Sequence, residues 1–421
     1  MRQRLKYRHT KFATLSAVVS AALLAAMPAG AAETVKIAFI DVLSGPFAKA
    51  GEGSLAQLRE VVSTINSRAA PNDPRFEVVP FDGKGSPQES VTVLKAATDQ
   101  GIRYITQGGG SGVAFALSEA LTKLAGRDPD KATLFLNYSA MDPGLTNDRC
   151  SFWHFRFYPS SEMKIEALTT WMTKRADIKK VFLLNQNYTH GQQVSKASRE
   201  YLARKRPDIQ IVGDDFIPIA QVRDFAPHVA KIRASGADTV ITSNWGSDLT
   251  LLFKSARDSG LNINFFTMNA NNPGTPQQMG PWGDGKVGVI WNWGHNAPTP
   301  ELEKVYVDFK KKTGEDFIFA AHWNSVTMLQ TAMRQAKSTH AVKVAFALEG
   351  MKYKSPIGDV EMRKTDHQLQ APLFLGIWGK QGTKGIKYDA EGTGYGFRSE
   401  QVWDSYISAQ PTSCQMKRPG A

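Results

Sequence analysis

Strand-like and helix-like segments alternate along most of this chain, and that order limits the folds open to it. Short apolar runs such as Val35–Val42 and Phe76–Phe81 have the length of buried strands. Between them Leu55, Leu58 and Val62 recur at helical spacing. A β-α-β-α order predicts parallel sheets covered by helices on both faces.

The alternation breaks at the aromatic stretch 150–159 and then restarts. Further strands are expected at Lys180–Leu184, Ile209–Phe216, Asp238–Ser243, Ile263–Met268 and Val287–Trp293, with helices between the first four of them. Helices are expected at Pro300–Thr313, Ala321–Lys337 and Val342–Leu348, and the C-terminal part holds short strands such as Leu373–Trp378. The sequence therefore predicts two α/β units of similar size and a third segment that returns to one or both.

The first 32 residues have the pattern of a secretory signal peptide. A basic head is followed by the apolar run Ala13–Met27 and by the small residues Ala29, Gly30 and Ala31. A membrane anchor is the alternative, but the run is shorter than the ~20 residues that a span requires. We expect residues 1–32 to be removed on export.

Charge and cysteine content exclude several classes. The net charge is +12, but the basic residues are spread along the chain, and the runs at 204–206 and 310–312 are expected on exposed helix ends, so no nucleic-acid partner is predicted. No two histidines of the exported chain stand at helical metal-ligand spacing, so neither a metal nor a cofactor is predicted. The two cysteines, Cys150 and Cys414, are expected to form a disulfide in an oxidising compartment.

Polar and aromatic residues follow the expected strands. A glycine-rich turn, 107–112, leads from one strand into a helix, where the N–H groups around Gly110 and the Ser111 hydroxyl suit an anion. It matches neither a Walker loop nor the dinucleotide fingerprint, and a turn with no ligand is the alternative. Similar stretches follow other strands, at 137–143, 185–191, 244–246 and 269–272. Because ligands of open α/β sheets bind at strand carboxyl ends, we expect a small organic ligand between the two units.

Lys36–Ile40, followed by Leu43-Ser44-Gly45-Pro46, resembles the N-terminus of type I periplasmic binding proteins, in the leucine/isoleucine/valine-binding branch of ABC-transporter receptors. The resemblance extends over about 34–380 and includes Ser255–Gly260. It implies two doubly wound parallel-sheet lobes joined by three hinge strands, the Venus-flytrap arrangement. Lobe 1 is expected to hold 33–156 and 294–357, and lobe 2 to hold 159–290 and part of 358–421, with hinges near 155–158, 291–293 and 356–360.

The resemblance also assigns site residues. Ser111 matches the serine that binds the ligand carboxylate, and Ser139 and Met141 match a segment that contacts the ligand head group. His190 and Trp245 fall on aromatic wall positions, and Asn269 falls where amino-acid receptors place an acid against the ligand ammonium. Gly110 in the glycine-rich turn and the flat ring of Tyr138 complete the expected site.

Departures from the family pattern concern the ligand. Asn269 carries no charge, Met141 replaces a threonine, and Ala50 and Gly109 replace larger residues. We therefore expect a periplasmic, monomeric, non-enzymatic receptor that delivers a bulky or aromatic carboxylate to the permease subunits of an ABC importer in the inner membrane. The alternatives are a branched-chain amino acid or an amide as ligand, a secreted hydrolase using Ser111 and His190, and a sensor domain of the same fold; the identity of the ligand is left open.

Overall fold

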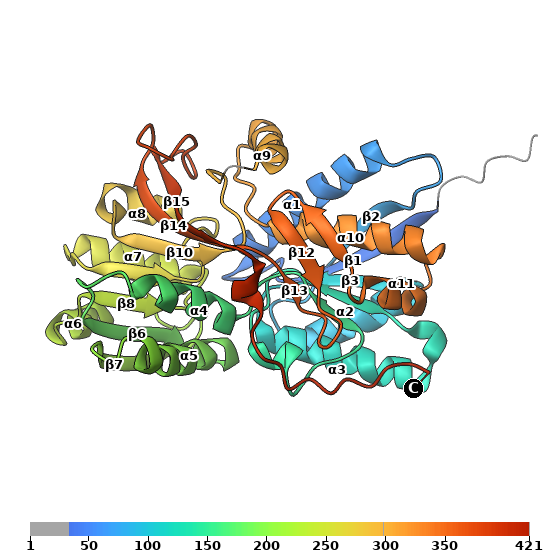
Figure 1. Ribbon diagram of the computed structural model, residues 1–421, viewed down its shortest axis with the longest axis horizontal. Coiled ribbons are helices and arrows are strands. Elements are labelled where there is room, and N and C mark those ends of the chain that lie inside the picture. The colour runs from blue at the N-terminus through green and yellow to red at the C-terminus, as the bar shows by residue number, and fades with distance from the viewer. Residues whose placement is uncertain (1–32, 298, 421) are drawn as a thin grey trace, which may run out of the picture.

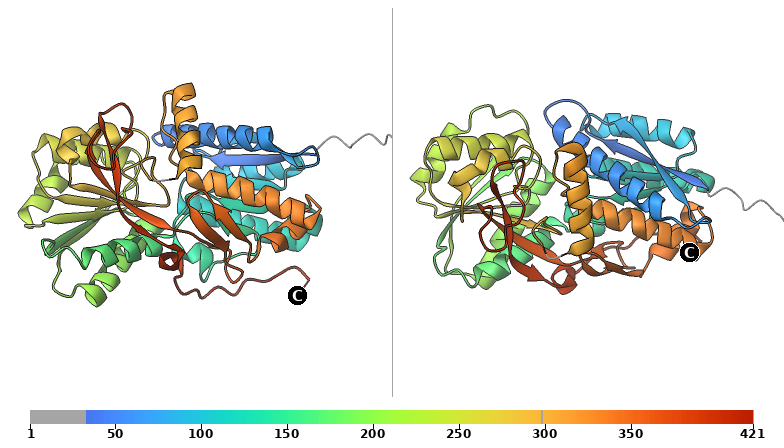
Figure 2. Two further views of the ribbon diagram at one scale, coloured as in Figure 1. Left: turned by 45° about the horizontal axis from the view of Figure 1, so that its top comes forward. Right: turned by 90° about the horizontal axis from the view of Figure 1, so that it is seen from above.

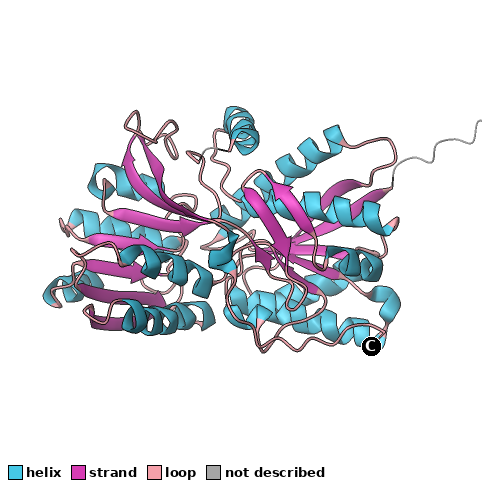
Figure 3. Cartoon of the chain, in the orientation of Figure 1, coloured by secondary structure: helices cyan, strands magenta, loops and turns pink. Residues whose placement is uncertain are grey.

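The computed structural model describes residues 33–297 and 299–420 as two α/β bodies side by side (Figure 1). The expected signal peptide at 1–32 lies outside the described residues. Two further views show the same separation into two bodies, and each has its sheet between helices (Figures 2 and 3). We call the body built on the five-stranded sheet the first lobe and the body built on the seven-stranded sheet the second lobe.

The first lobe contains a five-stranded sheet in the order β2-β1-β3-β4-β5, with all neighbours parallel. Its strands are β1 (Thr34–Asp41), β2 (Arg75–Asp82), β3 (Tyr104–Gln107), β4 (Leu134–Asn137) and β5 (His154–Arg156), and its first helices are α1 (Ala48–Arg68), α2 (Pro87–Asp99) and α3 (Ser111–Arg127). Local signals explain the helix starts: Ser86 caps α2 and Pro87 occupies its first position. The chain order reverses between β1 and β3, which places a ligand crevice at their carboxyl ends.

The second lobe contains a seven-stranded sheet in the order β15-β14-β10-β9-β8-β6-β7. Its strands are β6 (Lys180–Gln186), β7 (Gln210–Ile217), β8 (Thr239–Thr242), β9 (Asn264–Thr267), β10 (Val287–Trp291), β14 (Leu373–Lys380) and β15 (Tyr395–Trp403), and its helices are α4 (Ser161–Met172), α5 (Thr189–Lys205), α6 (Ala226–Ala234), α7 (Ser247–Asp258) and the short α8 (Pro276–Met279). The strands from β10 to β7 are parallel, whereas β14 and β15 add to the edge as an antiparallel pair. The parallel-dominant sheets confirm the expected fold class.

The segment after β10 forms three helices and a small sheet. These are α9 (Pro300–Thr313), α10 (Ala320–Ala336), α11 (Ala341–Leu348), β11 (Lys352–Ser355), β12 (Gly358–Met362) and β13 (Leu369–Gln370). The helix α10 packs against α1 and α11, so the segment returns to the first lobe. The helix α9 stands between the two bodies (Figures 1 and 2) and pairs with both, through Arg68–Glu301 on one side and Lys387–Glu303 on the other.

The third expected hinge, at 356–360, lies elsewhere. Ser355 and Gly358 close a β11–β12 hairpin, and Gly358 has φ of 120° at this turn. The chain instead enters the seven-stranded sheet between β13 and β14, close to residues 371–372. The predicted hinge lies too early in the chain, because Pro356 begins a tight turn and not an extended connection. The other two connections, after β5 and after β10, lie near the expected positions.

The C-terminal tail crosses from the second lobe back to the first (Figure 1). Cys150 and Cys414 form the expected disulfide, with Cα atoms 5.6 Å apart. The Thr412 hydroxyl donates to the Thr146 carbonyl at 2.7 Å, and Arg418 pairs with Glu349 at 3.0 Å. The tail thus forms a fourth connection between the lobes.

Candidate functional site

A pocket opens between the carboxyl ends of the parallel strands of the two sheets. Every expected binding residue lines it: Gly110, Ser111, Tyr138, Ser139, Met141, His190, Trp245 and Asn269. The structure therefore brings these residues together, since each follows a strand of its own sheet.

The first-lobe wall is organised by Asp41, at the end of β1. Its Oδ2 accepts hydrogen bonds from the Gly108 and Gly109 N–H groups, both at 3.0 Å, and from the Tyr138 hydroxyl at 2.7 Å. Its Oδ1 accepts from the Val42 N–H at 2.8 Å. Burial raises the pKa of the Asp41 carboxyl above its ordinary value, whereas these hydrogen bonds lower it. Asp41 thus fixes the glycine-rich turn and the neighbouring tyrosine.

The glycine-rich turn leads directly into the N-terminus of α3. Gly110 has φ of 97°, a conformation that favours glycine, and Ser111 is the first residue of the helix. The Asp142 N–H donates to Ser111 Oγ at 3.2 Å, which leaves the hydroxyl proton available as a donor. A hydroxyl donor at a helix N-terminus favours an anionic group such as a carboxylate.

The second-lobe wall is polar but carries no charge. His190, in the first turn of α5, is buried, and neither of its ring nitrogens has a hydrogen-bond partner. Burial lowers the pKa of His190 to about 3, with a further contribution from Lys164, so the ring is neutral near pH 7. Asn269 donates its amide N–H groups to the Ser243 and Asn244 carbonyls, at 3.0 and 3.3 Å, and so its Oδ1 is left as an acceptor.

Two aromatic side chains meet across the lobes at the edge of the pocket. Phe47, just before α1, stacks on Trp245 with ring centroids 4.2 Å apart, and the Trp245 indole N–H donates to the Tyr188 hydroxyl at 3.0 Å. Gly246 makes this contact possible, because a Cβ there would lie 2.2 Å from the Phe47 ring. One face of Trp245 is therefore covered by Phe47, and only its remaining surface is open to a ligand.

Tyr138 also differs from the expectation of a free flat surface. Its ring lies against His322 at 4.3 Å and meets Phe319 edge-on at 5.4 Å, while its hydroxyl is bound to Asp41. Tyr138 therefore shapes the wall rather than presenting an open face.

Sequence reasoning did not assign Phe319, Tyr188 or Asn272, which also line the pocket. Asp41, the last residue of β1, was not assigned a role either. Tyr188 and Asn272 lie in stretches that were identified as strand ends, and their position there was the available signal. Phe319 arrives from the segment before α10, and no local pattern marks it.

The part of the chain that the structure describes contains neither a metal centre nor a helix suited to span a membrane. Within 33–297 and 299–420, no three His, Cys, Asp or Glu side chains are grouped so as to hold a metal ion. In the same residues, none of the helices is both long and apolar enough to cross a membrane.

Comparison with known proteins identifies relatives over nearly the whole chain. A family model described as "Periplasmic binding protein" matches residues 34–383. The Leu/Ile/Val-binding protein homolog 4 of Brucella abortus (strain 2308) is 31% identical over 413 residues, 96% of this chain and 98% of the relative. These matches confirm the resemblance inferred from the sequence.

Solved structures show the same fold. The leucine-, isoleucine-, valine-, threonine- and alanine-binding protein of Brucella ovis, in a closed conformation, has a TM-score of 0.82 at 30% identity and covers 92% of this chain and 100% of that chain. An ABC-transporter solute-binding protein of Rhodopseudomonas palustris BisB5, in complex with 3,4-dihydroxybenzoic acid, has a TM-score of 0.75 at 17% identity and covers 92% and 99%.

Proposed function

The chain belongs to the periplasmic binding protein family and is a solute-binding protein of an ABC transporter; we propose that its ligand is a bulky carboxylate without an ammonium group, such as an aromatic acid. Its relatives are transport receptors and not enzymes, which rules against a secreted hydrolase that uses Ser111 and His190.

The charge distribution of the pocket carries this proposal. Among the described residues that line it, Asp41 is the only one with a carboxylate or a permanent cation. Both Asp41 oxygens already accept hydrogen bonds from the chain. A ligand ammonium would lie in a closed cleft without a free carboxylate partner, which is strongly unfavourable. A carboxylate, by contrast, finds Ser111 and the N-terminus of α3.

A ring hydroxyl would complete the match at the second lobe. Neutral His190 has one donor and one acceptor nitrogen, and neither has a partner among the residues that the structure describes. Asn269 adds an acceptor through its Oδ1. A solute-binding protein of the same fold is in complex with 3,4-dihydroxybenzoic acid, so this fold can bind a hydroxylated aromatic acid.

Binding in this scheme closes the two lobes, because only the closed state brings Ser111 and His190 to one ligand. The connections after β5, β10 and β13 act as the hinges. The exported, periplasmic protein would then present the closed form to the permease subunits of the importer.

A branched-chain amino acid is the second candidate, and the names of the relatives favour it. In that case Asp41 would have to give up one of the hydrogen bonds that it accepts within the chain in order to bind the ligand ammonium.

Calorimetric titration of the chain from residue 33 separates the two candidates. We expect 4-hydroxybenzoate to bind more tightly than leucine or valine. Micromolar binding of leucine with no binding of benzoate or 4-hydroxybenzoate would replace the aromatic-acid proposal by the amino-acid one. Trp245→Ala should weaken the binding of either ligand, since it removes a pocket wall and the contact with Phe47.

A further inference from the structure

A second pocket lies beside the first one. We call it the side pocket; Lys49, Asn271, Glu315, Asp316 and Glu391 are among its lining residues. Its walls continue those of the main pocket, because the residues that follow Lys49 and Asn271 in the chain line the main pocket. The side pocket therefore lies at the same seam between the lobes.

Two buried oxygen atoms of residues that line the side pocket lack a hydrogen-bond donor among the described residues. Asn271 is only 7% exposed, and its Oδ1 has no hydrogen-bond partner. Glu391 Oε1 accepts from the Gly274 N–H at 2.5 Å, and the Gln277 N–H also acts on the carboxylate, but Oε2 is buried with no partner at hydrogen-bond geometry among the described residues. Buried acceptors are normally satisfied, so two in one pocket point to a group that supplies N–H or O–H donors.

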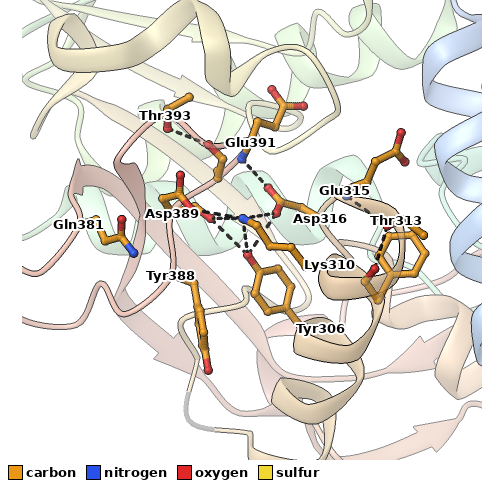
Figure 4. Close-up of polar contacts among 12 residues, drawn as sticks. Tyr306, Lys310, Thr313, Glu315, Asp316, Gln381, Tyr388, Asp389, Glu391 and Thr393 are labelled. Atoms are coloured by element: carbon orange, nitrogen blue, oxygen red, sulfur yellow. Dashed lines mark hydrogen bonds and ion pairs between the residues drawn. The ribbon is translucent and has the colours of Figure 1, made fainter.

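The surrounding contacts hold the Glu391 carboxylate in place. Glu391 has φ of 53°, and its N–H donates to Asp316 Oδ2 at 2.8 Å. Lys310 neutralises Asp316, with Nζ 2.9 Å from Oδ1, whereas the Glu391 carboxylate extends away from Lys310 (Figure 4). Asp316 is thus paired within the chain, and Glu391 is not.

The charges around the side pocket favour a cation. Lys49 is the only cation among the described lining residues; its charge acts on the Glu391 carboxylate, but it forms no ion pair within 4.0 Å with a described residue. Glu315, Asp316 and Glu391 outnumber it, and of these three Lys310 pairs only with Asp316, while it also pairs with Asp389 outside the pocket lining. Burial raises the pKa of the Glu391 carboxyl, so a bound cation would stabilise its charged form.

We propose that the side pocket binds a primary ammonium group, with Glu391 Oε2 and Asn271 Oδ1 as its acceptors. An ammonium has three N–H donors and no acceptor, which matches walls that offer unpaired oxygens and net negative charge. A divalent metal ion fits less well, since no three His, Cys, Asp or Glu side chains of the described residues are grouped to bind one. The ammonium belongs either to a free small amine or to an arm of the main-pocket ligand that reaches the side pocket. The second source rests on the carboxylate site proposed above and would correct that proposal in one respect, since the ligand would then carry an ammonium outside the main pocket.

Calorimetry with ethylammonium chloride tests the free-amine source, with tetramethylammonium chloride as the cation that lacks N–H donors. We expect ethylammonium to bind with one site, and Glu391→Gln or Asn271→Ala to weaken it at least tenfold. Lys49→Met should strengthen binding, because it removes a competing positive charge. The control Glu77→Gln removes one exposed carboxylate from β2 and should change the affinity less than twofold. Thermal melts check that each variant is folded. If either Glu391→Gln or Asn271→Ala fails to fold, the other variant still tests the site.

A second pair of probes, 4-(2-aminoethyl)benzoate and 4-ethylbenzoate, tests the ligand-arm source. A gain of at least tenfold for the amine over the ethyl compound, lost in Glu391→Gln, would assign the ammonium to the ligand. If neither benzoate binds but ethylammonium does, the proposed ligand class fails and the ammonium site stands. If ethylammonium binds no better than tetramethylammonium and the amine gains nothing over the ethyl compound, the side pocket holds water only and the proposal is overturned.

Discussion

Ser111 is held with its oxygen already accepting a hydrogen bond, from the Asp142 N–H, and with its proton available to a ligand. We expect Ser111→Ala to weaken binding of an aromatic carboxylate by roughly 10- to 150-fold, the equivalent of ~1.5–3 kcal/mol for a hydrogen bond to a charged group. Calorimetric titration of 4-hydroxybenzoate measures the change. Ser118→Ala is the matched control, because Ser118 is buried in the same helix but does not line the pocket. Equal affinities for the two variants would remove Ser111 from the carboxylate site.

The turn before α3 depends on close packing at one glycine. A Cβ at Gly109 would lie 2.1 Å from Asp41 Oδ1, whereas a Cβ at Gly112 would meet no atom within 4 Å. We therefore expect Gly109→Ala to displace the turn and abolish detectable ligand binding. Gly112→Ala adds a methyl group where no atom lies within 4 Å, so this variant should bind the ligand within about threefold of the affinity of the unmodified protein. Ligand titration of the two variants, with a thermal melt of each, decides between them; full binding by Gly109→Ala would show that the turn does not position the site.

The tail is anchored to the first lobe by the Cys150–Cys414 disulfide, which closes a loop with a sequence separation of 264. Because closing a long loop restricts the unfolded chain, we expect the double variant Cys150→Ser/Cys414→Ser to lose ~2–5 kcal/mol of unfolding free energy. Urea unfolding measures the loss, and Ser413→Ala, at an exposed neighbour, serves as control. Titration should find no free thiol in the denatured, unreduced protein. Two free thiols, or equal unfolding free energies, would contradict the role of the bond.

Elements with a strong local pattern could be predicted from the sequence, and those formed by distant pairing could not. The buried parallel strands are continuous apolar runs, as in β4 and β6, and their ends located most of the site. Strand β11 reads Lys-Tyr-Lys-Ser and is only partly buried, so nothing local distinguishes it from a loop. Strand β15 is defined by pairing with β14, and Phe319 reaches the pocket only because its segment returns to the first lobe.

At the scale of the whole molecule, the binding site exists only where the lobes meet. The first lobe supplies the helix N-terminus beside Gly110, and the second supplies the uncharged wall with His190. The Phe47–Trp245 stack bridges them at the edge of the pocket. Each lobe alone presents only its own wall of the pocket, so we expect the affinity to depend on the free energy of closure as well as on the pocket.

Burial of uncharged histidines throughout the molecule links its stability to pH. Burial lowers the pKa of His190 and His322 to about 3 and of His295 to about 4, and it lowers the pKa of His154 well below its ordinary value. In the unfolded chain these side chains titrate near 6.5. Below that pH the unfolded state takes up protons that the folded state does not, so the free energy of unfolding falls as the pH falls.

His322 gives the sharpest test of this link. Its Nε2 lies 2.8 Å from Ser54 Oγ, and burial is the cause of its lowered pKa. Between pH 6 and 4 it should contribute up to ~1.4 kcal/mol of lost stability per pH unit. His322→Gln can keep the contact with Ser54 but cannot be protonated. Per pH unit, the unfolding free energy of this variant should therefore fall by up to ~1.4 kcal/mol less than that of the unmodified protein, whatever the two free energies are at pH 7. Urea unfolding across this range compares it with the unmodified protein and with His340→Gln, an exposed control. Because the carboxylates titrate alike in all three, equal slopes for His322→Gln and the unmodified protein would mean that His322 is protonated in the folded state.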